Sequence, residues 1–222
     1  MKRKTINKIS TEEQIRRTVE NMAPEIFRGG EKHEKILEAT LTLMERYGFK
    51  KTTVDDIARE AQVAKGTVYL YFRDKQDIFI NIIFKKVARL FMDVLEKIEG
   101  LPDVPSKILC AIRTIIEYHR NDEAINRILA QDMDFLGPLL FKEILRIEGY
   151  LVDFIAQFLR AGIKEGSIRS DMDVVMTARM IMRFNQANIF RIKTGEPVDV
   201  DKYIATFRKI VLEGIGSRRK KR

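Results

Sequence analysis

The chain has 222 residues, of which 45% are hydrophobic and 33% are charged, with 5 prolines and 12 glycines. This composition excludes bulk disorder and a collagen-like repeat, and it allows one large domain or two small ones. The net charge is +9; residues 1–75 hold 16 Lys and Arg against 12 Asp and Glu, residues 76–217 balance at 20 against 20, and the last five residues are basic. Basic ends suit a polyanionic partner, although two solvated tails would give the same distribution.

No secretion or membrane segment is expected. The basic start Met1-Lys2-Arg3-Lys4 leads into no apolar stretch, and nowhere do about 18 apolar residues follow one another, which predicts a cytoplasmic protein. The single cysteine, Cys110, excludes an intramolecular disulfide. Its apolar neighbours favour packing over redox sensing.

Residues 1–30 are predicted to form an N-terminal extension that is partly helical or disordered. Ser10 and Glu13 are placed as a capping box for a short amphipathic helix, which Pro24 and the Gly29-Gly30 pair interrupt. An ordered extra helix, an arm that reaches DNA and a frayed terminus all fit this pattern.

Residues 31–76 show two short helices after a longer one. Apolar residues recur at helical spacing from Glu31 to Tyr47 and stop at Gly48, a suitable C-cap. Thr53 and Asp56 are spaced as a capping box for a short second helix, and a break at 61–63 precedes another short helix over 64–71.

The rest of the chain predicts further helices, so we expect an all-α fold. A long helix runs from about Lys75 to Glu99 with apolar residues on several faces, and helices follow at about 106–120, 122–134, 138–165, 173–193 and 199–215. Turn and cap residues separate them. We expect a helical effector-binding and dimerisation domain over 77–216, joined through the long helix, and a basic tail over 217–222.

The stretch from Thr52 to Phe79 resembles the tetracycline-repressor (TetR) family of bacterial regulators. The resemblance rests on the threonine pair, Val54, Ile57-Ala58, Val63, Lys65-Gly66-Thr67-Val68-Tyr69, Tyr71-Phe72 and Lys75 before an apolar helix. It implies that residues 31–76 are a three-helix DNA-binding domain with a helix-turn-helix.

The chemistry of the short helix over 64–71 fits a recognition helix in the major groove. Small and polar residues at its start allow close approach to base edges, two tyrosines suit phosphate contacts, and the helix starts at Thr53 and Lys75 can point backbone N–H groups at phosphates. Ala64 stands where many family members have serine, so a side-chain cap is missing. Val63, Val68 and Phe72 are interpreted as core. The predicted DNA-binding residues are Thr53, Lys65, Gly66, Thr67, Tyr69, Tyr71 and Lys75.

The last two helices, about Asp173–Thr194 and Asp199–Ile215, are predicted to form a homodimer interface, as the resemblance implies. One helix-turn-helix covers few base pairs, and two-fold pairing supplies enough contacts for specific binding. A core within one subunit would give the same pattern. The apolar candidates are Val175, Met176, Met180, Ile181, Phe184, Ile189, Tyr203, Ile204, Phe207, Ile210 and Val211.

A ligand chamber in the helical domain would be lined by apolar and aromatic side chains with a few polar groups, although each candidate also suits ordinary core packing. The predicted lining is Phe91, Leu95, Ile112, Ile116, Tyr118, His119, Met133, Phe135, Leu151, Phe154, Phe158, Met180 and Phe184. The polar candidates are Arg113, Gln157, Arg183, Asn185 and Asn188.

An enzyme is not expected. The chain has no Glu-x-x-His pair, phosphate loop or cysteine cluster, and its two histidines are His33, predicted to be solvated, and His119. We expect no cofactor and no metal. The sequence predicts a repressor that a small apolar or amphipathic effector releases from a palindromic double-stranded operator. A regulator that binds a protein partner, and an activator, are the alternatives.

Overall fold

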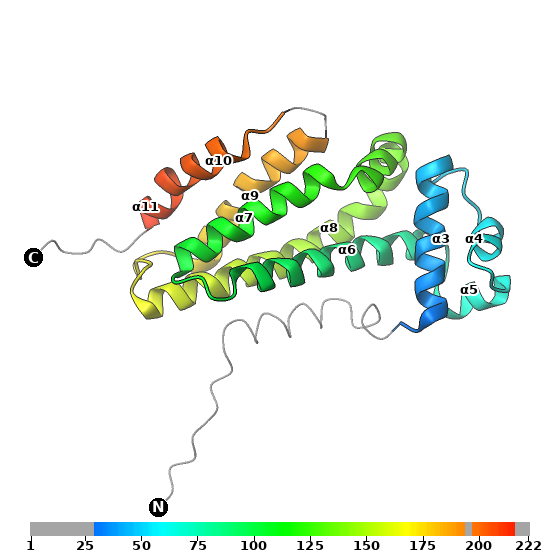
Figure 1. Ribbon diagram of the computed structural model, residues 1–222, viewed down its shortest axis with the longest axis horizontal. Helices are drawn as coiled ribbons and strands as arrows, with labels where there is room; N and C mark the ends of the chain where they lie inside the picture. The colour runs from blue at the N-terminus through cyan, green and yellow to red at the C-terminus, as the bar shows by residue number, and fades with distance from the viewer. Residues whose placement is uncertain (1–28, 194–196, 216–222) are drawn as a thin grey trace, which may run out of the picture.

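The computed structural model describes residues 29–193 and 197–215, and these residues form the predicted all-α fold. Residues 1–28 of the predicted extension and the basic tail at 217–222 lie outside the described residues. Figure 1 shows three helices at one end of the molecule and a bundle of longer helices that extends away from them.

The three helices at this end are α3 (Glu31–Tyr47), α4 (Val54–Glu60) and α5 (Lys65–Tyr71). Gly48 ends α3 with φ 82°, a conformation that glycine adopts without strain. Ile36, Met44 and Ile57 are fully buried between these helices. The predicted bounds of all three helices are confirmed to within one residue.

Helix α6 (Lys75–Ile98) runs from the three-helix end into the bundle (Figure 1). Its N-cap is Asp74, whose side chain accepts a hydrogen bond of 2.8 Å from the backbone N–H of Asp77. Ile82 belongs to the apolar cluster of α3–α5, whereas Phe84 belongs to that of the bundle. The helix therefore needs apolar residues on several faces because it takes part in two cores.

Helix α7 (Val104–Asn121) packs against α6 and begins two residues before the predicted start. Asp103 caps it by accepting a hydrogen bond of 2.7 Å from the backbone N–H of Ser106. Pro105 fits in the first turn because the N–H groups there have no acceptor within the helix.

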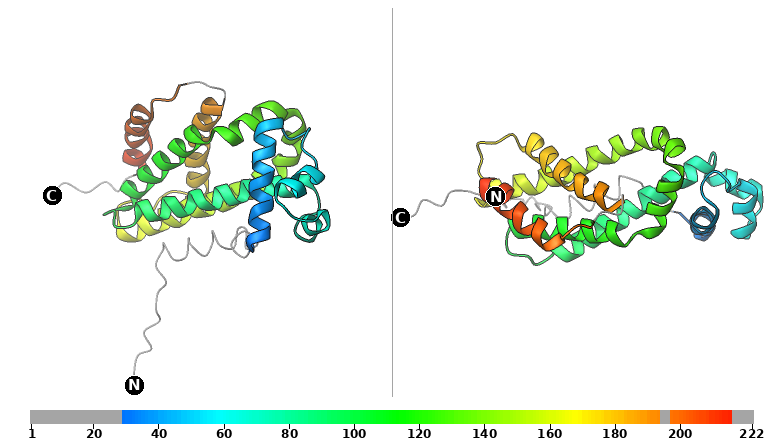
Figure 2. Two further views of the ribbon diagram at one scale, coloured as in Figure 1. Left: turned by 45° about the vertical axis from the view of Figure 1, so that its right-hand side comes forward. Right: turned by 90° about the horizontal axis from the view of Figure 1, so that it is seen from above.

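The predicted break at Gly137-Pro138 is wrong. A single helix, α8 (Glu123–Glu165), replaces the two expected at 122–134 and 138–165. An interior proline removes one hydrogen bond and kinks a helix without necessarily ending it. Figure 2 shows the axis of α8 bending in its N-terminal part, so the chain turns within one helix instead of in a loop.

Helix α9 (Val174–Lys193) packs along α8. The predicted helix at 199–215 consists of α10 (Val200–Phe207), a π-helical stretch η1 (Arg208–Leu212) and α11 (Glu213–Ile215) in direct succession. In Figure 2, α10 lies alongside α7. Across the described ranges, no helix combines the length and apolar character that crossing a membrane requires.

The two apolar clusters meet at a second point besides α6. Ile125 and Ile128, in the first turns of α8, are buried in the cluster that α3–α5 form. Helix α8 thus contacts α3 directly. The three-helix end is held to the bundle by α6 and by the beginning of α8.

Candidate nucleic-acid interface and effector cavity

The turn between α4 and α5 is built from local hydrogen bonds. The Thr53 hydroxyl accepts a hydrogen bond of 3.2 Å from the Asp56 N–H and donates to the Asp56 carboxylate, so the predicted capping box is confirmed. The hydrogen bond from the Thr53 hydroxyl holds the pKa of Asp56 below its ordinary value. Between the helices, Gln62 adopts φ 56° and the Val63 N–H donates to the Ala58 carbonyl at 3.0 Å.

One face of α5 is anchored in the core. Val68 and Phe72 are buried and Val63 is partly buried against the same cluster, as interpreted from the sequence. Ala64 stands at the N-cap and makes no side-chain hydrogen bond there. A helix of seven residues without a side-chain cap depends on this anchoring for its stability.

The opposite face of α5 is open to solvent. Lys65 and Gly66 are exposed, Tyr69 and Tyr71 are 51% and 43% exposed, and Thr67 is half-buried. Leu70 is 83% exposed and was not among the predicted DNA-binding residues. Its position could have been found from the helical register, because it lies about 180° around the helix from the buried side.

Lys65 forms an ion pair with a neighbouring helix. Its ammonium group donates to the Asp55 carboxylate of α4 at 2.9 Å, and this hydrogen bond raises the pKa of Lys65. Both side chains are more than half exposed. The cation is therefore fixed at the α4 side of the exposed face.

The Lys75 side chain points into the protein. Its ammonium group donates to the backbone carbonyls of Phe49 at 2.6 Å, Thr52 at 2.7 Å and Lys50 at 3.3 Å, and it lies 4.4 Å from the centre of the Phe49 ring. The sequence interpretation placed Lys75 on the DNA surface. Its side chain joins the start of α6 to the α3–α4 loop, and the predicted contact of the backbone N–H groups at this helix start with a phosphate stays a prediction.

The predicted solvation of His33 is wrong. The ring is buried, stacks on Phe72 at 4.9 Å between ring centres and meets the edge of Tyr71 at 5.8 Å. A histidine offers an aromatic face as well as polar nitrogens, so it can pack against rings where periodicity alone suggests a polar surface. His33 thereby links α3 to the end of α5.

An apolar cavity of about 80 Å³ lies in the bundle between α6, α7, α8 and α9. Phe154 is its central aromatic residue, with ring centres 4.8 Å from Phe91 and 5.1 Å from Phe158. Lys107, Asn185 and Gln186 are the polar residues in its lining. The predicted residues that line it are Phe91, Ile112, Leu151, Phe154, Phe158 and Asn185; the lining that was not predicted is Lys107, Ile108, Ala111, Ile115, Ile155, Ile181, Met182 and Gln186.

Several predicted lining residues lie elsewhere. Leu95 and Ile116 are buried in the bundle core outside the cavity, and Met180 and Phe184 are 55% and 49% exposed. Apolar periodicity marks buried and exposed stripes of a helix alike, which explains these errors. Arg113 pairs with Asp201, Arg183 pairs with Glu148, and Gln157 is half-buried outside the cavity lining; the side chains of Met133, Phe135 and Asn188 lie outside the described residues.

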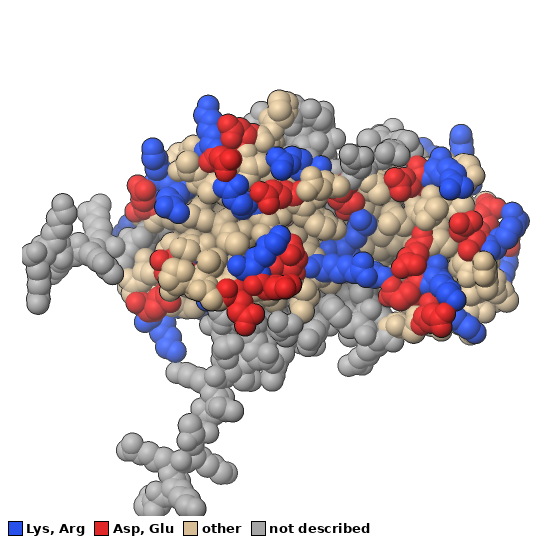
Figure 3. Space-filling view, viewed as in Figure 1, with Lys and Arg blue, Asp and Glu red and all other residues tan. Residues whose placement is uncertain are grey.

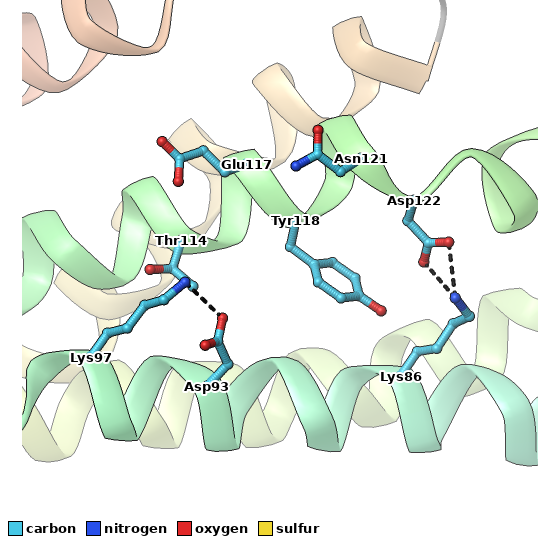
Figure 4. Close-up of a pocket in the computed structure, with 8 residues that line it drawn as sticks. All are labelled: Lys86, Asp93, Lys97, Thr114, Glu117, Tyr118, Asn121 and Asp122. Carbon is cyan, nitrogen blue, oxygen red and sulfur yellow. Dashed lines mark hydrogen bonds and ion pairs between the residues drawn. The ribbon is translucent and has the colours of Figure 1, made fainter.

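Tyr118 and His119 were both predicted to line the apolar cavity. Tyr118 lies at a polar pocket instead, and the His119 ring packs edge-on against the Tyr118 ring, with 5.6 Å between the ring centres. Figure 4 shows the pocket between α6 and α7, with the Tyr118 hydroxyl pointing toward the ion pair of Lys86 and Asp122. Its volume is about 420 Å³, and its other lining residues are Asp93, Lys97, Thr114, Glu117 and Asn121. Burial and the Asp122 carboxylate raise the pKa of Tyr118, so the phenol stays protonated.

Charges of both signs are mixed on the surface. On the face drawn in Figure 3, Lys and Arg alternate with Asp and Glu over the three-helix end and the bundle alike. A search of the described residues finds no group of three or more His, Cys, Asp or Glu side chains that could hold a metal ion.

A short helix anchored on one face and open on the other, followed by a helical bundle with an apolar cavity, defines a helix-turn-helix transcription regulator. Residues 36–82 match the family model described as bacterial regulatory proteins, tetR family. The match covers most of α3, all of α4 and α5, and the start of α6.

Three comparisons extend beyond this segment. The uncharacterized HTH-type transcriptional regulator YhgD of Bacillus subtilis is 25% identical over 184 residues, which are 82% of this chain and 95% of that protein. The fatty acid metabolism regulator protein of B. subtilis is 27% identical over 151 residues, 68% and 77% of the two chains. The crystal structure of FadR from B. subtilis in complex with stearoyl-CoA has a TM-score of 0.65 and 22% identity, covering 82% of this chain and 98% of that one.

Proposed function

We propose that the protein is a repressor that binds a palindromic operator as a homodimer and leaves it when an apolar or amphipathic effector binds in the bundle. The exposed face of α5, held from behind by Val68 and Phe72, is the observation that carries the DNA-binding part. Its start is small and polar, which lets the backbone approach base edges. An activator would use the same contacts, and reporter expression with and without the gene distinguishes the two.

Sequencing of genomic fragments that the purified protein retains tests DNA recognition and supplies the operator. Tyr69→Ala should lower operator affinity by about 10- to 100-fold, the effect expected when a hydrogen bond to a charged phosphate is lost. Tyr69→Phe keeps the ring and isolates the hydroxyl contribution. Because Tyr69 is half exposed, both variants should unfold at the wild-type temperature. Unaltered binding by Tyr69→Ala would contradict the assignment.

The dimer interface that we propose lies on α8 and α9. Met176, Met180 and Phe184 are exposed at four-residue spacing along α9, which places them on one stripe. Phe141 and Leu145 on α8 are exposed as well, one or two turns before the Glu148 that pairs with Arg183 of α9. Large apolar side chains exposed on two helices that pack together are typical of a protein interface.

The structure distinguishes these residues from the subunit core, which the sequence could not do. Ile181, Ile204 and Phe207 were candidates for the interface and are buried within one chain. Among the side chains described between residues 197 and 214, Ile210 of η1 is the large apolar residue that remains exposed. Helix α10 therefore contributes its apolar side to the bundle. We propose that α8, and not the predicted helix at 199–215, forms the interface together with α9.

The effector site that we propose is the apolar cavity around Phe154. A volume of about 80 Å³ is small for a drug-sized ligand, so phenylalanine side chains must move when an effector enters. The FadR structure with stearoyl-CoA supports an effector with a long hydrocarbon chain, because its fold is similar. Stearoyl-CoA is the first probe, with free CoA as the control that lacks the chain. A regulator that responds to a protein partner instead would ignore both.

The two contacts between the apolar clusters supply the coupling. The clusters meet between Ile82 and Phe84, close to the predicted domain boundary at 76–77. Movement of α8 around the cavity is transmitted to α3 through Ile125 and Ile128, and movement of α6 is transmitted through Lys75. An effector shifts the population only if it binds the two arrangements with different affinities.

Filling the cavity should separate effector response from DNA binding. Ala111 is buried on the cavity wall, and Ala111→Leu would occupy the space with its own side chain. We expect operator binding to persist and release by stearoyl-CoA to need at least about tenfold more ligand, since a misfit of even one methylene group in an apolar pocket costs about 1–3 kcal/mol. Ala161→Leu, at a partly buried α8 position outside the cavity lining, is the control in the same operator-release titration. A wild-type response from Ala111→Leu would move the effector site elsewhere.

A further inference from the structure

Leu70 projects from the middle of the exposed face of α5. Each helical residue turns by about 100°, so Leu70 lies roughly opposite the direction shared by Val68 and Phe72. Those two side chains are buried, whereas Leu70, at 83% exposure, is the most exposed of the large apolar residues in the described ranges. The fold thus directs an isobutyl group straight away from the protein.

Gly66 lies one turn before Leu70 on the same face. A Cβ atom added to Gly66 would meet nothing within 4 Å, so neither packing nor backbone conformation within this chain requires a glycine there. Helical side chains lean toward the N-terminus, which places the Leu70 side chain over the turn that contains Gly66. The pair forms an apolar projection next to a position without a side chain.

The Lys65 side chain is directed toward α4. The Lys65 ammonium group lies 2.9 Å from the Asp55 carboxylate on α4. A bidentate contact from Lys65 to guanine would first have to break this ion pair. Leu70 and Gly66 make the centre of the exposed face apolar. Tyr69 and Tyr71 lie about 100° to either side of Leu70 around the helix.

We propose that Leu70 selects thymine at one position of each half-site by packing on the C5-methyl group, and that Gly66 leaves room for that base pair to approach the helix. This inference rests on the proposed operator binding. Thymine is the base that presents a methyl group in the major groove, and apolar side chains recognise it by contact. Leu70 is thus a specificity-determining residue.

The test replaces each thymine of the selected operator by deoxyuridine, one at a time, which removes only the methyl group. Binding is measured by fluorescence anisotropy with the full-length protein. For the wild type we expect one thymine in each half-site, at positions related by the operator's symmetry, whose replacement lowers the affinity about fourfold. This is the effect of exposing one methyl-sized apolar group. Leu70→Ala removes the contact from both half-sites of the dimer, so it should bind the thymine operator about 16-fold more weakly, roughly fourfold for each half-site, and should show no further loss when either thymine is replaced.

Two further measurements keep the result interpretable. Leu70→Ala should unfold at the wild-type temperature because its side chain is exposed, so a fall in affinity cannot come from misfolding. Repeating the selection with Leu70→Asn should replace thymine by adenine at the same position, since asparagine pairs with the adenine edge. The inference is overturned if no deoxyuridine substitution weakens the wild type, or if the loss persists in Leu70→Ala. Failure to retain any DNA fragment would instead overturn the proposed function.

Discussion

Met180→Glu should convert the proposed dimer to a monomer and lower its affinity for the full operator by about 100- to 1000-fold. The stripe of Met176, Met180 and Phe184 is exposed in one chain and would be buried between two. A carboxylate at its centre would lose its hydration without gaining a partner. The affinity falls because a dimer holds its second recognition helix at high effective concentration once the first has bound.

The measurement combines sedimentation velocity with anisotropy titrations on the full operator and on a half-site. Half-site affinity should stay at the wild-type value, since α9, the helix that carries Met180, lies away from α5 (Figure 1). Arg120→Glu, at an exposed position on α7, adds acidic charge away from the stripe and should remain dimeric. A dimeric Met180→Glu variant would show that the subunits meet on another surface.

Lys75→Met should lower the free energy of unfolding by roughly 2–3 kcal/mol, the cost of losing hydrogen bonds from a charged donor to partly buried acceptors. The variant leaves the carbonyls of Phe49 and Thr52 without the ammonium group that lies within 2.7 Å of each. The α3–α4 loop positions the start of α4, so operator affinity should fall as well. Lys202→Met, on an exposed part of α10, should change neither property.

The salt dependence of DNA binding separates this role from a phosphate contact. Denaturant titration gives the stability, and affinity measured at several salt concentrations gives the number of phosphates that are neutralised. If Lys75 holds the loop, stability falls and the salt slope is unchanged. A wild-type stability with a slope reduced by about one unit would restore Lys75 to the DNA surface.

The DNA-binding half could be predicted from sequence because its signals are local. Gly48 at the end of α3 and the Thr53–Asp56 pair at the start of α4 act within a few residues, and both occur in the structure as predicted. The long-range partners were beyond such reasoning. The ammonium of Lys75 meets carbonyls more than twenty residues away, and the burial of His33 depends on rings contributed by α5.

The bundle was less predictable because apolar spacing does not say what covers an apolar face. Phe154 and Phe184 have the same chemistry, yet one lines the cavity and the other is exposed. The prediction at Pro138 was wrong for a related reason. A proline that kinks a helix and a proline that follows the end of a helix look alike in sequence, and here the helix α8 continues through it. Leu70 was overlooked because leucine usually belongs to a core.

Ile125 and Ile128 are buried in the apolar cluster around α3, so residues 31–76 do not supply the whole core of the DNA-binding domain. A cut after residue 76 would expose apolar side chains that the beginning of α8, nearly fifty residues later, normally covers. Chimeras that exchange the sensing half between relatives must therefore match the first turns of α8 to the α3 that they touch. In this protein, part of the surface that joins the DNA-binding domain to the helical bundle belongs to the bundle.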